Sequence, residues 1–222
     1  MTLSAKGVAR QFLGRTGTIS ARQTFGPVPS GGLSLRHQLR SLARQEISFE
    51  WSEPNCIFGG TAAFEQIWSE IRVRVRLIPS RAVRSDPAGI FPGVRAIWET
   101  TIETFWSDKW AIGRRGEVAC PLTFDVQFVD DDAHHEVYVD VCGVGRSCRT
   151  NSGNWYISDA GPVAAHEFGH LLGHRDEYSE PPKCPDRDPV GTGTVMDNNS
   201  NNVPARLMTR FATNVGSKIV PT

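Results

Sequence analysis

Residues 162–178 read PVAAHEFGHLLGHRDEY, which is the strongest structural pattern in the chain. Pro162 suits the first turn of a helix, where its missing N–H is not needed. His166 and His170 are four residues apart, so a helix would bring both imidazoles to one face, where they could share a metal ion. Gly173 follows three residues later and suits a helix end, because glycine readily adopts a positive φ. The stretch therefore predicts a helix with a metal site, ending near Gly173.

The residue types around the two histidines favour zinc. Imidazole nitrogens and carboxylate oxygens are common zinc ligands, and a catalytic zinc site has three protein ligands and one position for water. Asp176, the eleventh position counted from His166, is the preferred third ligand because Gly173 lets the chain turn back toward the metal. Glu167 could serve as general base toward the metal-activated water without binding the ion itself.

Other side chains could supply the third ligand in place of Asp176. In order of preference these are His174, then Glu177 or Glu180, then His134 or His135 from an upstream loop. The plainest alternative has no metal at all, with two histidines that merely lie on the surface of a helix. Sequence spacing favours Asp176 and leaves these alternatives open.

The motif resembles the metzincin clan of zinc peptidases, whose pattern is HExxHxxGxxH followed by a turn that contains methionine. The third ligand position departs from that pattern, since it holds Asp176, as in the snapalysin-like small bacterial peptidases. The sequence pattern HEFGHLLGxxDEY also resembles metallopeptidase domains of bacterial effector toxins. The close match covers residues 161–178, and Met196 in GTVMDNN has a spacing suited to the methionine turn. The resemblance does not extend to the N-terminal half.

This resemblance implies a zincin-type endopeptidase in which His166, His170 and Asp176 bind Zn²⁺ and Glu167 is the general base. The implied partner is a peptide or protein substrate, and the likeness to effector toxins adds delivery machinery or a cognate inhibitor. A zinc hydrolase that cuts peptidoglycan cross-links would use the same residues. A non-catalytic, zinc-stabilised binding module is a third interpretation, although such a site needs no base beside its ligands.

Hydrophobic periodicity predicts the strands and helices of an α/β (α+β) domain, and the resemblance to zincins implies that the strands form a mixed twisted sheet. Apolar residues alternate with arginines over Ile71–Leu77, the period-two pattern of a strand with one wet face. Apolar residues at helical spacing predict a long backing helix over Val94–Trp110. Further strands are expected at Cys120–Val129, Glu136–Val141 and Asn154–Ser158. The last two could offer a sheet edge to an extended substrate. After Tyr178 the chain is rich in Pro, Gly and Asn, so regular structure in this C-terminal part should be sparse.

The zincin-like domain is expected over residues 61–222, after an N-terminal extension or linker at 1–60. Within that extension, Gly26–Gly32 is turn-rich, and leucines at helical spacing predict an amphipathic helix over Leu33–Ile47. No apolar core of a signal peptide occurs near the N-terminus. The chain is therefore expected to be secreted or delivered as part of a larger protein, or else to stay in the cytoplasm.

Charge and hydropathy argue against two classes of partner. Lys plus Arg and Asp plus Glu both total 24 in 222 residues, so the formal net charge is zero. Nucleic acids and anionic membranes attract basic surfaces, which this balance does not favour. No apolar run approaches the roughly 20 residues of a membrane-spanning helix. We expect neither nucleic-acid binding nor membrane insertion.

Five cysteines are present, namely Cys56, Cys120, Cys142, Cys148 and Cys184. None belongs to a CxxC pair, so a second zinc site built from thiolates is not expected. Cys142 and Cys148 flank a glycine-containing bend and could form a disulfide in an oxidising compartment. The alternative is that the thiols are free and mostly buried.

Overall fold

The computed structural model describes residues 44–221, apart from 54–55, 57 and 114–118. These residues belong to one compact unit. Its first strand, β1 (Arg44–Ser52), falls within the range 1–60 that we expected to be an extension. The turn predicted at 26–32, and residues 33–43 of the predicted helix, lie outside the described part of the chain. Residues 44–47 are strand, so the helix prediction is wrong there; Ile47, Phe49 and Trp51 alternate at the period of a strand.

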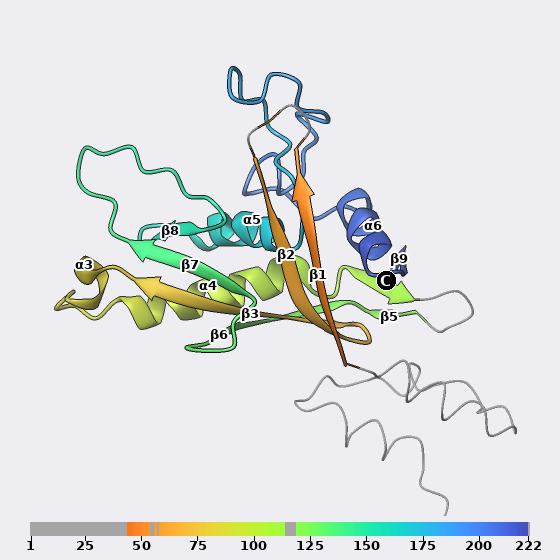
Figure 1. Ribbon diagram of the computed structural model, residues 1–222, viewed down its shortest axis with the longest axis horizontal. Helices are drawn as coiled ribbons and strands as arrows, with labels where there is room; N and C mark the ends of the chain where they lie inside the picture. Colours follow the sequence, from red (N-terminus) through yellow and green to blue (C-terminus); the bar gives the residue numbers. More distant parts are fainter. Residues whose placement is uncertain (1–43, 54–55, 57, 114–118, 222) are drawn as a thin grey trace, which may run out of the picture. The chain divides into compact units, whose positions relative to one another are not determined.

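The chain folds into a mixed α+β structure around a six-stranded sheet, as predicted (Figure 1). Its other strands are β2 (Gly59–Ile67), β3 (Glu70–Pro79), β6 (Thr123–Phe128), β7 (His135–Asp140) and β8 (Asn154–Tyr156). The order is β1-β2-β3-β7-β8, with β6 also paired to β3. Strands β1, β2 and β3 are antiparallel neighbours, whereas β6, β7 and β8 run parallel to the strands they join. Strand β7 lies between two others, so the prediction that it forms a free edge is wrong.

The described helices are α3 (Arg81–Arg84), α4 (Phe91–Trp106), α5 (Gly161–Leu171) and α6 (Ala205–Asn214). Helix α4 ends four residues earlier than expected, since Ser107 is extended (φ −80°, ψ 155°) and Asp108 then adopts φ 61°. Trp110 then begins β4 (Trp110–Gly113), the centre of a second sheet whose other strands are β5 (Cys120–Pro121) and β9 (Lys218–Pro221). Among the described residues, no helix has the length and apolar character needed to span a bilayer.

The C-terminal part agrees only partly with the expectation of sparse structure. Between Tyr178 and Ala205 the described chain has isolated bridges and turns but no helix and no longer strand. Helix α6 and strand β9 follow, and neither is predicted by the sequence analysis. Leu207, Met208 and Phe211 of α6 are buried in the core, so the helix is amphipathic in spite of its short length.

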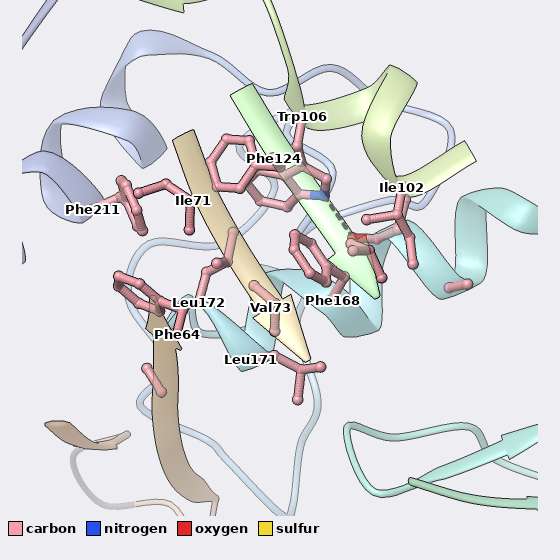
Figure 2. Close-up of a cluster of buried hydrophobic side chains, with 14 of the residues drawn as sticks. Phe64, Ile71, Val73, Ile102, Trp106, Phe124, Phe168, Leu171, Leu172 and Phe211 are labelled. Atoms are coloured by element: carbon pink, nitrogen blue, oxygen red, sulfur yellow. Dashed lines mark hydrogen bonds between the residues drawn. The ribbon is translucent and has the colours of Figure 1, made fainter. Parts of the chain in front are cut away.

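One face of the main sheet forms the hydrophobic core. Ile71, Val73 and Val75 of β3 are fully buried, whereas the arginines between them lie on the opposite face. Helices α4 and α5 pack on the buried face, where Trp106 and Phe168 meet (Figure 2). The Trp106 indole N–H donates a 2.9 Å hydrogen bond to the carbonyl of Ala165, which ties α4 to α5. Burying an aromatic side chain stabilises the fold by roughly 2–3 kcal/mol, so this layer holds α5 firmly.

The hairpin of β1 and β2 belongs to the main sheet, but most of its length extends past the part that pairs with β3. Strand β2 pairs with β3 only through Glu65–Ile67, whereas it pairs with β1 along its whole length. The free part of the hairpin passes α5 (Figure 1). Trp51, near its end, stacks on His170 with ring centroids 5.5 Å apart. The hairpin thus forms a wall beside the face of α5 that has the two histidines.

Candidate metal centre

Helix α5 presents His166 and His170 toward a common point, and the backbone holds both rings. The Nδ1 atom of His166 lies 2.7 Å from the carbonyl oxygen of Val195, and that of His170 lies 2.8 Å from the carbonyl of His174. A carbonyl oxygen only accepts, so each Nδ1 must donate its proton. In the neutral form of each ring, Nε2 then has a lone pair, the form in which imidazole binds a metal.

Asp176 completes a group of three possible ligands, as the sequence predicts. Its Oδ1 atom lies 3.0 Å from Nε2 of His166 and 3.2 Å from Nε2 of His170. One ligand atom from each residue lies within 4.8 Å of the others, and all three residues are buried. Two imidazoles and a carboxylate that converge in a buried space can hold a metal ion, which replaces the proton on each Nε2.

Gly173 lets the chain return to the helix after α5 ends. It adopts φ +88°, as predicted from its position. Its N–H donates to the carbonyl of His170 at 2.9 Å, and the next N–H reaches the carbonyl of Gly169 at 3.0 Å. A Cβ atom at residue 173 would lie 2.7 Å from the ring of Phe49. The position therefore needs glycine both for its backbone conformation and for the close approach of the β1–β2 hairpin.

His174, the main alternative for the third ligand, lies in the core instead. Its ring stacks on Trp106 with centroids 5.4 Å apart and is 1% exposed. Burial, together with nearby positive charge on Arg210, lowers the pKa of His174 to about 3. Its contribution to the centre comes through its backbone carbonyl, which orients His170.

The remaining alternatives have other partners among the described residues. Glu177 pairs with Arg206, Glu180 with Arg149, His134 with Glu46, and His135 with the backbone of Ala63. Glu177 also accepts hydrogen bonds from Thr192 and Thr194. None of these four side chains belongs to the group formed by His166, His170 and Asp176.

Glu167 borders the ligand group without belonging to it. Its Oε2 atom lies 3.9 Å from Nε2 of His170, and no described residue donates a hydrogen bond to it. Burial raises the pKa of Glu167, although the nearby His170 and His166 partly oppose this effect. A buried carboxylate oxygen without a partner, next to a possible metal site, is available to a water molecule or a substrate.

Met196 packs against Gly169 of α5. It is fully buried, and a Cβ atom added to Gly169 would lie 2.5 Å from its sulfur. The carbonyl of Met196 accepts a 2.8 Å hydrogen bond from the N–H of Glu177, and the carbonyl of neighbouring Val195 holds His166. The turn around Met196, which the sequence analysis singled out, therefore packs against α5. Its backbone carbonyls also accept hydrogen bonds from His166 and from Glu177, the residue after Asp176.

Two contacts behind Asp176 involve residues that the sequence analysis did not assign. The Tyr178 hydroxyl donates a 3.0 Å hydrogen bond to Oδ2 of Asp176, and an Nη atom of Arg187 lies 3.5 Å from the same oxygen. Burial alone would raise the pKa of Asp176, but without a metal ion the Nε2 atoms of His166 and His170 can donate hydrogen bonds to its carboxylate, and these lower the pKa well below its usual range. Arg187 stands in the sequence PDRDP, where no periodicity indicates burial, so nothing local could have identified it.

A cleft of about 310 Å³ opens beside the group. Glu167, His170 and Asp176 form its floor. The surrounding residues come from three segments and are Trp51, Glu53, Phe58, Gly59, Arg149, Thr150, Asn151, Ser152, Tyr178 and Lys183. A ligand in the cleft would therefore meet the possible metal ion and Glu167 together.

Both disulfides of the described chain lie near this cleft. Cys142 pairs with Cys148, one of the two outcomes that the sequence left open, and closes the loop before Arg149. Cys56 pairs with Cys184, which the sequence did not predict.

Fold and site together define the chain as an α+β protein with a buried His-His-Asp group that can hold a metal ion. Comparisons with protein families, with curated proteins and with solved structures found no match to it.

Proposed function

We propose that this chain is a zinc-dependent peptidase, with Zn²⁺ bound by His166, His170 and Asp176. The observation that supports this most is the convergence of two imidazole Nε2 atoms and one carboxylate oxygen beside a cleft. Zinc commonly has three such nitrogen and oxygen ligands in hydrolases. The zincin-type interpretation of the motif belongs to the same proposal.

Zinc, when bound, would lower the pKa of water and polarise a substrate carbonyl. Glu167 supplies the proton transfer that hydrolysis also needs. Glu167 lines the cleft and its Oε2 atom has no hydrogen-bond partner among the described residues, so it can accept a proton from an attacking water molecule and return it to the leaving amine. A purely structural metal site would have no use for an unpartnered buried carboxylate at this place.

The proposed substrate is an extended peptide. Strand β8 ends the main sheet and retains the edge role expected for Asn154–Ser158. Residues 149–152, which line the cleft, directly precede it. Main-chain hydrogen bonds to such an edge would place a peptide beside the cleft. We further propose that the protein acts in an oxidising compartment, because two disulfides persist there and not in a reducing cytosol.

The test is a comparison of new peptide termini, identified by mass spectrometry, in a partly unfolded protein mixture. Zinc-loaded wild type is compared with Glu167→Gln, and the zinc content of both is measured. A lost general base should reduce cleavage roughly 100- to 10,000-fold while zinc remains bound. Glu103→Gln, which changes a carboxylate on α4 that contacts the backbone of Val126, is the matched control and should cleave like wild type.

Equal cleavage by wild type and Glu167→Gln, or none by either, would overturn the peptidase proposal. Purified peptidoglycan sacculi, treated with the same two proteins, would then identify a hydrolase of cross-links. A biological effect that survives Glu167→Gln would indicate a zinc-stabilised binding module.

A further inference from the structure

Glu53 and Arg187 form a buried ion pair next to the ligand group. The Nε atom of Arg187 donates a 2.7 Å hydrogen bond to Oε2 of Glu53, and each side chain is 3% exposed. The two residues are 134 positions apart in the chain. Burying charges costs free energy that only their pairing and hydrogen bonds offset. A pair of this kind, whose glutamate lines the cleft and whose arginine approaches Asp176, suggests a role beyond packing.

The rest of the Arg187 guanidinium faces the segment that includes Asp176. One Nη atom donates a 2.9 Å hydrogen bond to the carbonyl of Tyr178, and the guanidinium stacks over the Tyr178 ring at 4.9 Å. The other Nη atom has no hydrogen-bond partner within the described residues and lies 3.5 Å from Oδ2 of Asp176 and 3.6 Å from Oε2 of Glu180, which already pairs with Arg149. The carboxylate of Asp176 is therefore held from two sides, with Oδ1 toward the histidines and Oδ2 toward Arg187 and Tyr178.

We infer that Arg187, itself fixed by Glu53, is a positioning residue that orients Asp176 for metal binding. Its positive charge offsets the cost of a buried carboxylate, and its planar fork can hold Glu53, the backbone and Asp176 at once. A lysine has one point of charge and could not make these contacts together. The inference rests on the proposed function only in assuming that Asp176 binds the metal.

The Cys56–Cys184 disulfide joins the two segments that this ion pair connects. The N–H of Cys56 donates to the carbonyl of Glu53 at 3.2 Å, and the N–H of Arg187 donates to the carbonyl of Cys184 at 3.4 Å. The disulfide and the ion pair thus join the same two segments, that of Glu53 and Cys56 and that of Cys184 and Arg187. The covalent bond keeps Glu53 within reach of Arg187, so that Arg187 stays behind Asp176.

The test measures zinc affinity by competition with a chromophoric chelator and, separately, the free energy of unfolding of zinc-free protein. Arg187→Met should weaken zinc binding about 10- to 100-fold, the usual effect of losing a partner of a metal ligand. Arg187→Lys should recover part of that loss, since it restores the charge without the fork. In the double variant Glu53→Gln/Arg187→Met, the carboxylate of Glu53 is not left buried without its arginine, so stability should rise above that of Arg187→Met while zinc affinity stays low.

Arg72→Gln is the matched control, because Arg72 also pairs with a buried carboxylate, that of Glu65, outside the centre. It should bind zinc like wild type. The absorption spectrum of bound Co²⁺ adds a readout of ligand geometry, which should change in Arg187→Met and stay constant in Arg72→Gln.

Two results would overturn the inference: zinc affinity equal to wild type in Arg187→Met, or full recovery of affinity in the double variant. The second result would mean that Arg187 serves stability alone. Failure of the proposed function is distinguishable from both. A wild type that binds zinc but cleaves no peptide would contradict the peptidase and leave the role of Arg187 to be decided by affinity. A wild type that binds no zinc would overturn both proposals.

Discussion

At the scale of single residues, backbone carbonyls determine how the two histidines can act. Val195 and the backbone of His174 each accept the Nδ1 proton of one ring, so both Nε2 atoms are free to bind a metal. The His-x-x-x-His spacing was visible in the sequence. The acceptors were not, because nothing in the residue types of Val195 or His174 indicates where their carbonyls point.

Variants of Asp176 and of the next residue, Glu177, test which of the two carboxylates is the third metal ligand. Asp176→Ala should reduce zinc affinity roughly 100-fold or more, since losing a metal ligand costs at least as much as losing a residue that hydrogen-bonds to a ligand. Glu177→Gln should leave zinc affinity unchanged, because Arg206 and two threonines hold that carboxylate elsewhere. It should instead lower the free energy of unfolding by about 1–3 kcal/mol. Chelator competition and urea denaturation measure the two effects, and the opposite pattern would make Glu177 the ligand.

A histidine outside the centre predicts how stability depends on pH. Burial lowers the pKa of His135 to about 4 from an ordinary 6.5, although its hydrogen bond to Ala63 opposes this. The unfolded chain therefore binds the proton more readily. The contribution of His135 to stability is complete above about pH 6.5 and falls as the pH drops toward 4, by at most about 3 kcal/mol.

Urea denaturation between pH 4 and 8 measures this dependence. His135→Gln should be less stable at neutral pH but should lose less stability on acidification than wild type. If both proteins show the same slope between pH 6.5 and 4, other groups cause the acid sensitivity.

At the scale of elements, the centre depends on the meeting of α5 with the β1–β2 hairpin. Gly173, just after α5, lies against Phe49 of the hairpin. Gly173→Ala should destabilise the protein by about 2–4 kcal/mol, because a side chain would be strained at φ +88° and would collide with the ring of Phe49.

Gly191→Ala is the matched control for this prediction. Gly191 also has a positive φ, +62°, but no atom lies within 4 Å of an added Cβ. Its cost should be limited to backbone strain, about 1 kcal/mol. Chemical denaturation compares the two variants, and equal losses would show that the contact with Phe49 contributes nothing.

The elements also show where local patterns predict structure and where they do not. Alternation over Ile71–Leu77 and the motif around His166 correctly predicted β3 and α5, because each is long and strongly periodic. The segment 44–47 was assigned to a helix, yet pairing with β2 makes it strand. Cys120–Val129 divides at Leu122 because its two halves join different sheets. Such outcomes depend on partners that are distant in the sequence.

At the scale of the whole molecule, the two disulfides should differ in their effect on stability. Cys56 and Cys184 are separated by 128 positions, and Cys142 and Cys148 by 6. A cross-link stabilises chiefly by restricting the unfolded chain, so the longer loop should contribute about 5 kcal/mol and the shorter about 2. Denaturation of Cys56→Ser/Cys184→Ser and Cys142→Ser/Cys148→Ser in oxidising buffer measures this. A larger loss for the second variant would contradict the entropic account.

The sequence by itself determined the α+β class, the histidine helix and its end at Gly173, and the order in which Asp176 and its alternatives were ranked. These features follow from spacing along a regular helix or strand and from the conformational freedom of glycine. Only the tertiary structure decided that Asp176, and not His174 or Glu177, faces the histidines. It also placed Trp51, Glu53 and Arg187 around the centre. The reason is physical: burial, ion pairing and a disulfide join segments over a hundred residues apart, and no local pattern encodes which of them will meet.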